Sequence, residues 1–167
     1  FVKPSTSASN AKELIFDKLD SGYKVGTAGN KSVGRSQTNQ FFHGSEVAFW
    51  PNAAEHAKGI LQTIPDMPET EIIYESTANG LGNFFHQQWK LAESGQSEFI
   101  AIFVPWFWQE EYRKELPKDF VKSDVEHELS IQYELDDQQV YFMRQKIVQL
   151  SADGTNGEKA FKQEYPM

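Results

Sequence analysis

Two short polar segments carry the residue types that chemistry at a phosphate group requires. The first is the pair Ser45 and Glu46, which lies in an apolar stretch at residues 41–50. The second, at residues 76–80, consists of Ser76, Thr77, Ala78, Asn79 and Gly80. A carboxylate at the end of a strand can orient and activate a water molecule. A polar side chain on a neighbouring strand can respond to a γ-phosphate and to its loss.

The pattern around these segments alternates between strand and helix. Stretches rich in aromatic and β-branched residues predict strands at 41–50, 71–76 and 99–104. Apolar residues at helical spacing predict helices at 53–64 and 81–94. This alternation indicates an α/β fold with a parallel sheet. Since ligands of open sheets bind at the carboxyl ends of the strands, we expect the two polar segments to lie side by side there.

Helical patterns dominate both ends of the sequence. At residues 11–19 the apolar spacing predicts a helix. After the third strand, Ser123 and Glu126 form a capping-box pattern that starts another helix, and Asp136 or Asp137 can cap the next. The sequence therefore predicts that the strands give way to a bundle of helices.

The composition is that of a globular protein. The 167 residues are 39% apolar and 14% aromatic, which suits a domain or a large piece of one. A change in composition near Pro117 predicts a sheet-containing part at 1–116 and a helical subdomain at 117–167. Because the chain begins with Phe1 and not with Met, we expect that a preceding segment has been removed.

Charge and cysteine content exclude several kinds of site. The absence of cysteine excludes disulfides and thiolate metal ligands, and it fits a reducing cytoplasm. A net charge of −8 argues against a surface that coats nucleic acid, so any DNA contact needs a local basic patch or another part of a longer protein. The longest apolar run, at 99–107, is too short to span a membrane.

Four stretches together resemble one family. HGSEVAFWPN at 43–52 and IIYESTANGLGNFFHQQW at 72–89 resemble the Walker B element and the coupling motif of the ATPase domain of bacteriophage large terminases. FIAIFVPWFW at 99–108 and KAFKQEYP at 159–166 are also similar to that family. No single stretch is specific, but their order and spacing are, and the resemblance covers roughly residues 34–166.

The resemblance implies a fold and an activity. The fold is part of a P-loop NTPase core of the RecA-like (ASCE) type, with a mostly parallel sheet flanked by helices, followed by a small helical subdomain. The activity is ATP-driven packaging of double-stranded DNA into capsids, with Mg²⁺ as the metal, in the cytoplasm of a bacterial host. The implied partners are the portal protein, the small terminase subunit and further copies in a ring.

The resemblance also implies roles for individual residues. Glu46 matches the glutamate that activates water, and Ser45 stands where an aspartate usually supports Mg²⁺. This departure from the family pattern puts direct metal ligation in doubt, although a hydroxyl can hold a metal-bound water. Residues 76–80 match the motif that couples nucleotide state to movement. Arg35, in a Gly-Arg-Ser loop, matches a position that can stabilise transition-state charge in cis or in trans.

Two parts of such a motor are not found in the sequence. A phosphate-binding loop needs Lys or Arg beside Gly and Ser or Thr at a strand-to-helix turn. Residues 29–32, Gly-Asn-Lys-Ser, have the composition but are followed by Val33 and Gly34, which do not start a helix. The nuclease domain of the family would follow residue 167. We therefore expect this chain to be catalytically silent by itself.

Other interpretations remain open. Without the resemblance, Glu46 is an ordinary charge at a strand end, residues 76–80 are a turn in which Asn79 caps the next helix, and Arg35 is a surface residue. A metal site at His43 and Glu46 is disfavoured because residues three apart on a strand face opposite sides. Two other identities of the chain also remain open. It is another P-loop ATPase, such as a helicase, or a non-catalytic binding domain left from a prophage.

Overall fold

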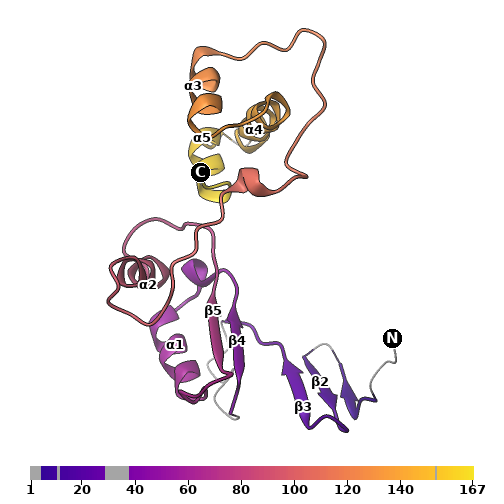
Figure 1. Cartoon of the computed structure of the whole chain (residues 1–167), viewed down its shortest axis with the longest axis vertical. Coiled ribbons are helices and arrows are strands. Elements are labelled where there is room, and N and C mark those ends of the chain that lie inside the picture. The colour runs from indigo at the N-terminus through magenta and orange to yellow at the C-terminus, as the bar shows by residue number, and fades with distance from the viewer. Residues whose placement is uncertain (1–4, 11, 29–37, 153) are drawn as a thin grey trace. The chain divides into compact units, whose positions relative to one another are not determined.

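The computed structural model describes residues 5–10, 12–28, 38–152 and 154–167, which form a mixture of helices and strands (Figure 1). The chain divides into two compact units, Phe1–Glu75 and Ser76–Met167, and each is described by itself. The described residues contain five α-helices and a small parallel sheet. Among them, no helix is both long and apolar enough to cross a membrane.

A three-stranded antiparallel meander opens the first unit. Its strands, in spatial order, are β1 (Ala8–Ser9), β2 (Glu13–Phe16) and β3 (Ser21–Lys24). The helix predicted at 11–19 is therefore wrong. A run as short as 13–16 fits either a helix or a strand by its spacing, and pairing on both sides of β2 makes it a strand. The side chain of Asn10 accepts the amides of Lys12 and Glu13, at 2.9 and 3.0 Å, and so shapes the turn before β2.

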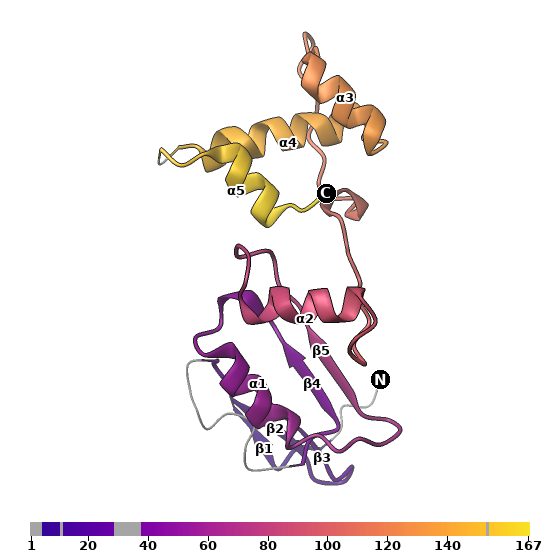
Figure 2. The ribbon, with the colours of Figure 1, turned by 90° about the vertical axis from the view of Figure 1, so that its left-hand side faces the viewer.

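A parallel pair of strands forms the rest of the regular sheet structure in the first unit. β4 (Phe41–Gly44) pairs with β5 (Glu71–Tyr74), and α1 (Ala53–Leu61) lies on the connection between them (Figure 2). This confirms the predicted strand–helix–strand order. The helix provides the long crossover that two consecutive parallel strands need. The buried side of α1 consists of Ala53, His56, Ala57 and Ile60.

The third predicted strand is absent from the described structure. Residues 99–104 have no strand pairing, and the side chains of Ile100 and Ile102 are 84% and 72% exposed. The apolar sequence suits a covered strand, but a strand also needs a neighbour for its backbone N–H and C=O groups. Within the described residues, the predicted mostly parallel sheet is therefore a two-stranded parallel pair and a separate antiparallel meander.

The second unit begins with an irregular segment and then α2 (Phe84–Glu93). This confirms the predicted helix, although it begins three residues later than the pattern indicated. Asn83 caps it by accepting the amide of His86 at 2.9 Å. Gly95 follows the last turn at φ 68°, a conformation that favours glycine.

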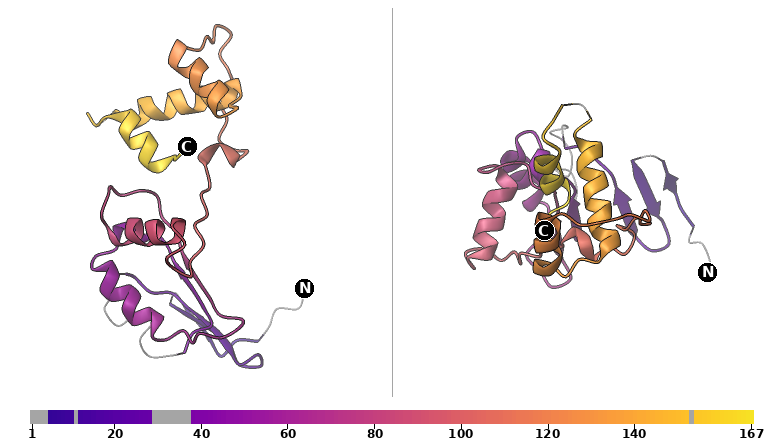
Figure 3. Two further views of the ribbon diagram at one scale, coloured as in Figure 1. Left: turned by 60° about the vertical axis from the view of Figure 1, so that its left-hand side comes forward. Right: turned by 90° about the horizontal axis from the view of Figure 1, so that it is seen from above.

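An aromatic core holds the end of the second unit together. Three helices surround it, and Figure 3 shows α5 folded back beside α4. They are α3 (Asp124–Gln132), α4 (Asp137–Leu150) and α5 (Gly157–Glu164). Trp106 stacks on Phe142 with ring centroids 5.7 Å apart and meets Phe161 edge-on at the same distance. The core includes Trp106, Leu135, Val140, Phe142, Met143 and Phe161. It therefore takes in a residue upstream of the predicted boundary at 117.

The predicted capping box at Ser123 and the predicted aspartate cap of the next helix are both present. Ser123 caps α3 with Glu126, and Asp136, one of the two predicted candidates, caps α4 with Gln139. Gly157 is the first residue of α5 and lies close to α4. A Cβ at this position would collide with the carbonyl oxygen of Ile147, so only glycine fits there.

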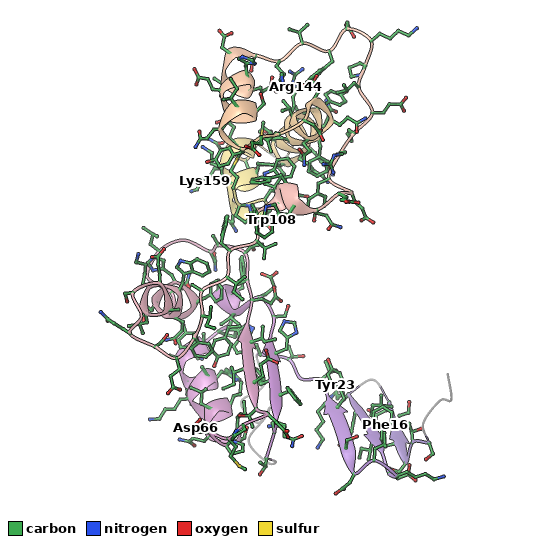
Figure 4. All side chains as sticks on the ribbon, in the orientation of Figure 1. Phe16, Tyr23, Asp66, Trp108, Arg144 and Lys159 are labelled. Carbon is green, nitrogen blue, oxygen red and sulfur yellow. The ribbon has the colours of Figure 1, made fainter. Side chains whose placement is uncertain are left out.

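One ion pair connects α3 to α4. Arg144, labelled in Figure 4, donates from Nε and Nη2 to the two carboxylate oxygens of Glu126, at 2.7 and 2.6 Å. It also donates to the Val121 carbonyl at 2.7 Å, and its guanidinium lies 4.8 Å from the centre of the Phe120 ring. The hydrogen bonds from Arg144, helped by those from Ser123 and opposed by partial burial, lower the pKa of Glu126 to about 2.

This ion pair gives the first prediction. Glu126→Gln should lower the free energy of unfolding at pH 7 by roughly 2–3 kcal/mol, because the folded state then loses its preference for the ionised carboxylate. A carboxyl group whose pKa is lowered on folding stabilises the protein above its unfolded pKa, and this contribution is lost as the pH falls from about 4.5 to about 2. Urea unfolding between pH 2.5 and 7 should therefore show the wild-type and variant curves converging in acid.

Glu128→Gln, on the exposed side of the same helix, is the matched control and should leave stability within about 0.5 kcal/mol of wild type. Equal stability of Glu126→Gln and wild type at pH 7 would show that the Arg144 pair contributes nothing.

Candidate functional site

Ser45 and Glu46 directly follow the last residue of β4. The strand is shorter than predicted, since it ends at Gly44 and a short 3-10 helix at Val47–Phe49 follows. Both Ser45 and Glu46 are exposed. The structure therefore places this pair at the carboxyl end of a parallel strand.

The backbone at this point contains one extra residue. Glu75 donates its amide to the Gly44 carbonyl at 2.9 Å, as in a regular parallel ladder. The next donor to the Glu75 carbonyl should then be the amide of Glu46, but it is the amide of Val47, at 3.1 Å. Glu46 is pushed out of the ladder in the manner of a β-bulge, a feature that re-aims side chains and is common beside active sites.

Glu46 has a backbone conformation that L-residues avoid. Its φ and ψ are 56° and 40°, in the left-handed region, where a side chain costs about 1–2 kcal/mol. Val47 and Ala48, the next two residues, are 0% and 7% exposed and anchor the turn in the interior. The bulge and this anchor hold Glu46 outward at the strand end.

The second polar segment continues directly from β5. Ser76 follows Glu75, the residue that is hydrogen-bonded to both Gly44 and Val47. Glu75 is thus the last residue of the first unit, and its backbone bonds to both sides of Ser45 and Glu46. The boundary between the two compact units falls between Glu75 and Ser76.

Residues 76–80 have no helix or strand structure, and β5 ends at Tyr74, two residues before the strand end predicted at Ser76. Ser76 and Thr77 are half-buried, whereas the three residues after them are exposed. Gly80 has φ 70°, which favours glycine at this place in the turn.

Asn79 does not cap α2, although one interpretation of the sequence gave it that role. The helix is capped by Asn83, whose side-chain amide also donates to the carbonyls of Asn79 and Gly80, at 2.9 and 3.2 Å. The sequence analysis missed Asn83 even though Asn is a preferred capping residue. These bonds connect the turn to the first residues of α2.

One predicted site residue and one rejected motif cannot be placed. Arg35, and the rejected phosphate-loop candidate at 29–32, lie outside the described residues. Of the predicted site residues, the structure describes Ser45 and Glu46 at the end of β4 in the first unit, and residues 76–80 in the second unit.

One further pair of polar side chains lies at this strand end. His43 Nε2 is 3.7 Å from a carboxylate oxygen of Glu75, and both side chains are exposed. The sequence analysis did not pair them, because a parallel register between β4 and β5 was needed to bring them together. In the described part of the chain, no group of three or more His, Cys, Asp or Glu residues is arranged to hold a metal ion.

The ligand chemistry of Ser45 and Glu46 nevertheless suits one kind of metal site. Mg²⁺ prefers oxygen ligands, and in nucleotide sites it uses one or two protein groups together with phosphate oxygens and waters. A hydroxyl beside a carboxylate, both exposed at a strand end, is of this type.

Comparisons with known proteins identify no relative. No protein-family model matches the chain, and no curated protein is similar enough to count as a match. The terminase resemblance therefore stays a prediction.

The strained conformation of Glu46 gives the second prediction. Glu46→Gly should be more stable than Glu46→Ala by about 1 kcal/mol, because glycine adopts a positive φ without the steric penalty of a Cβ. Thermal unfolding of both variants measures the difference. At Lys58, in the middle of α1, the same two substitutions should give the opposite order, since glycine weakens a helix. If Glu46→Ala is instead more stable than Glu46→Gly, Glu46 is not held in the left-handed conformation in solution.

Proposed function

We propose that this chain is part of the ATPase domain of a bacteriophage large terminase, the motor that packages double-stranded DNA into capsids. One observation supports this most strongly. Two polar segments with the residue types of an ATPase site begin at the carboxyl ends of two hydrogen-bonded parallel strands, β4 and β5. Open α/β sheets bind their ligands at that edge. The parent fold in this proposal is a RecA-like P-loop core, of which β4, α1 and β5 are one strand–helix–strand unit.

In this proposal Glu46 is the group that activates water. Its carboxylate accepts a proton from the water that attacks the γ-phosphorus, so that the water reacts as a better nucleophile. The strained backbone of Glu46 is consistent with this role, because proteins retain such strain most often at functional sites.

Ser45 supports the metal in the same proposal. ATP-bound Mg²⁺ neutralises charge that develops on the phosphates, and a serine hydroxyl can hold one of its waters. The phosphates themselves are held by a Gly-rich loop in another segment of the parent protein, and Arg35 adds positive charge near the transition state.

The 76–80 segment transmits the change in nucleotide state. Asn83 joins the backbone of Asn79 and Gly80 to the start of α2. A movement of the turn on loss of the γ-phosphate therefore displaces the first residues of α2 with it. This is a short mechanical connection from the nucleotide to a helix.

The partners follow from the same proposal. They are double-stranded DNA, the portal protein, the small terminase subunit and other copies of the motor in a ring, in the cytoplasm of the bacterial host. With a net charge of −8, this chain contributes little general attraction for DNA, so most of the phosphate contacts come from other parts of the motor.

The third prediction tests this function in a full-length protein that carries the phosphate loop. Glu46→Gln should lower kcat for DNA-stimulated ATP hydrolysis by at least about 100-fold, because the amide cannot accept the proton of water. ATP binding should be retained, as measured by the binding of a fluorescent ATP analogue. DNA packaging into empty capsids should stop in the same variant.

Glu71→Gln is the matched control, since Glu71 is an exposed residue at the opposite end of β5 and should leave kcat unchanged. An active Glu46→Gln enzyme would remove the water-activating role from this residue. Hydrolysis that drives strand separation, with no packaging, would instead assign the chain to a helicase. If the longer protein does not hydrolyse ATP at all, the binding-domain interpretation is favoured.

A further inference from the structure

The indole ring of Trp50 lies against the turn that carries Glu46. Its Nε1–H donates a hydrogen bond to the Ser45 carbonyl oxygen at 2.8 Å. The ring also covers Gly44 so closely that a Cβ there would lie 2.9 Å from Cη2 and 3.1 Å from Cζ2 of Trp50. The lack of a side chain at Gly44 therefore leaves room for the indole ring at the end of β4.

Aromatic neighbours hold the ring in this position. Phe42 of β4 meets Trp50 edge-on with centroids 6.4 Å apart, and His56 of α1 meets it edge-on at 6.2 Å. Phe42 in turn contacts Tyr74 of β5 at 6.2 Å. His56 is only 8% exposed. Trp50 thus contacts β4 and the helix that follows it, and Phe42 links the ring to β5.

The hydrogen bond from Trp50 acts on the peptide group that precedes Glu46. The Ser45 carbonyl and the Glu46 amide belong to one planar unit, so holding the oxygen limits rotation about the N–Cα bond of Glu46. Backbone hydrogen bonds also hold the turn, from Phe49 to the Glu46 carbonyl and from Val47 to the Glu75 carbonyl, at 2.9 and 3.1 Å. Replacing Trp50 by a residue without an N–H donor removes the indole bond.

We propose that Trp50 is a positioning residue that keeps Glu46 in its left-handed conformation and so aims its carboxylate. This inference rests on the proposed role of Glu46 in activating water. Trp50 does not touch the reacting atoms and acts only through the Ser45 carbonyl and the ring contact with Gly44. A tryptophan is required because phenylalanine fills much of the same space but has no N–H to donate.

The first experiment uses the chain itself and isolates the hydrogen bond. Trp50 is replaced by β-(3-benzothienyl)alanine, which keeps the bicyclic shape but has sulfur in place of N–H, and in parallel by Trp50→Phe. Hydrogen exchange measured by NMR should then show the Val47 amide exchanging about five- to tenfold faster, whereas core amides of α4 stay unchanged. Trp108→Phe, at a side chain that is 66% exposed, is the matched control and should leave Val47 as in wild type.

The second experiment measures activity in the full-length protein with the same replacements. The benzothienyl variant should lower kcat for ATP hydrolysis about five- to tenfold with KM for ATP unchanged, because water attack is affected and nucleotide binding is not. Combined with Glu46→Gln, it should cause no further loss, since both changes act through one group. A purely structural role would instead change KM and add to the loss.

The outcomes separate this inference from the proposed function. If Glu46→Gln is inactive but the benzothienyl variant has wild-type kcat and Val47 exchange, the positioning role is overturned and the function stands. If Glu46→Gln retains full activity, the proposed function fails and the role of Trp50 in aiming a catalytic carboxylate fails with it. Faster Val47 exchange together with a selective loss of kcat supports the inference.

Discussion

Backbone hydrogen bonding between β4 and β5 is the constraint on which the first unit depends. A strand is stable only where its N–H and C=O groups meet those of a neighbour. The parallel pairing of β4 with β5 requires a crossover, and α1 supplies it. The same requirement explains why residues 99–104, although apolar enough for a buried strand, are not one: no described strand pairs with them. Pairing, more than apolar character, decides which segments become strands here.

The irregularity at the end of this pairing produces the candidate site. A regular ladder would have placed the Glu46 amide on the Glu75 carbonyl, but Val47 takes that position. The displaced Glu46 then adopts a left-handed backbone, which the buried Val47 and the packing of Trp50 against Gly44 maintain. The free energy that this strain costs is offset by burial nearby. A strained, exposed carboxylate on a rigid strand end is a physical arrangement suited to catalysis.

The second unit depends on different interactions. Its helices begin at capping boxes and meet around aromatic side chains, with Trp106 and Phe142 stacked at the centre. The Arg144–Glu126 pair adds a fixed distance between α3 and α4, and Glu126 also belongs to the capping box of α3. Local capping and long-range pairing therefore use the same carboxylate, which couples the start of one helix to the side of the next.

Local signals in the sequence determined those parts of the structure that local chemistry controls. The helices of the second unit, their Ser123 and Asp136 caps, the Gly95 ending and the strand–helix–strand order around α1 all follow from spacing and capping residues within a few positions. The polar pair after β4 was also visible, because its residue types stand out in an apolar stretch.

Only the tertiary structure decided the features that depend on distant residues. The segment at 13–16 became a strand through its neighbours, whereas 99–104 pairs with no strand among the described residues. The bulge at Glu46 and the contact of His43 with Glu75 required the register of β4 against β5. The physical reason is that periodicity reports which side chains share a face, whereas hydrogen-bond partners and backbone strain are set by chain segments that the local pattern does not contain.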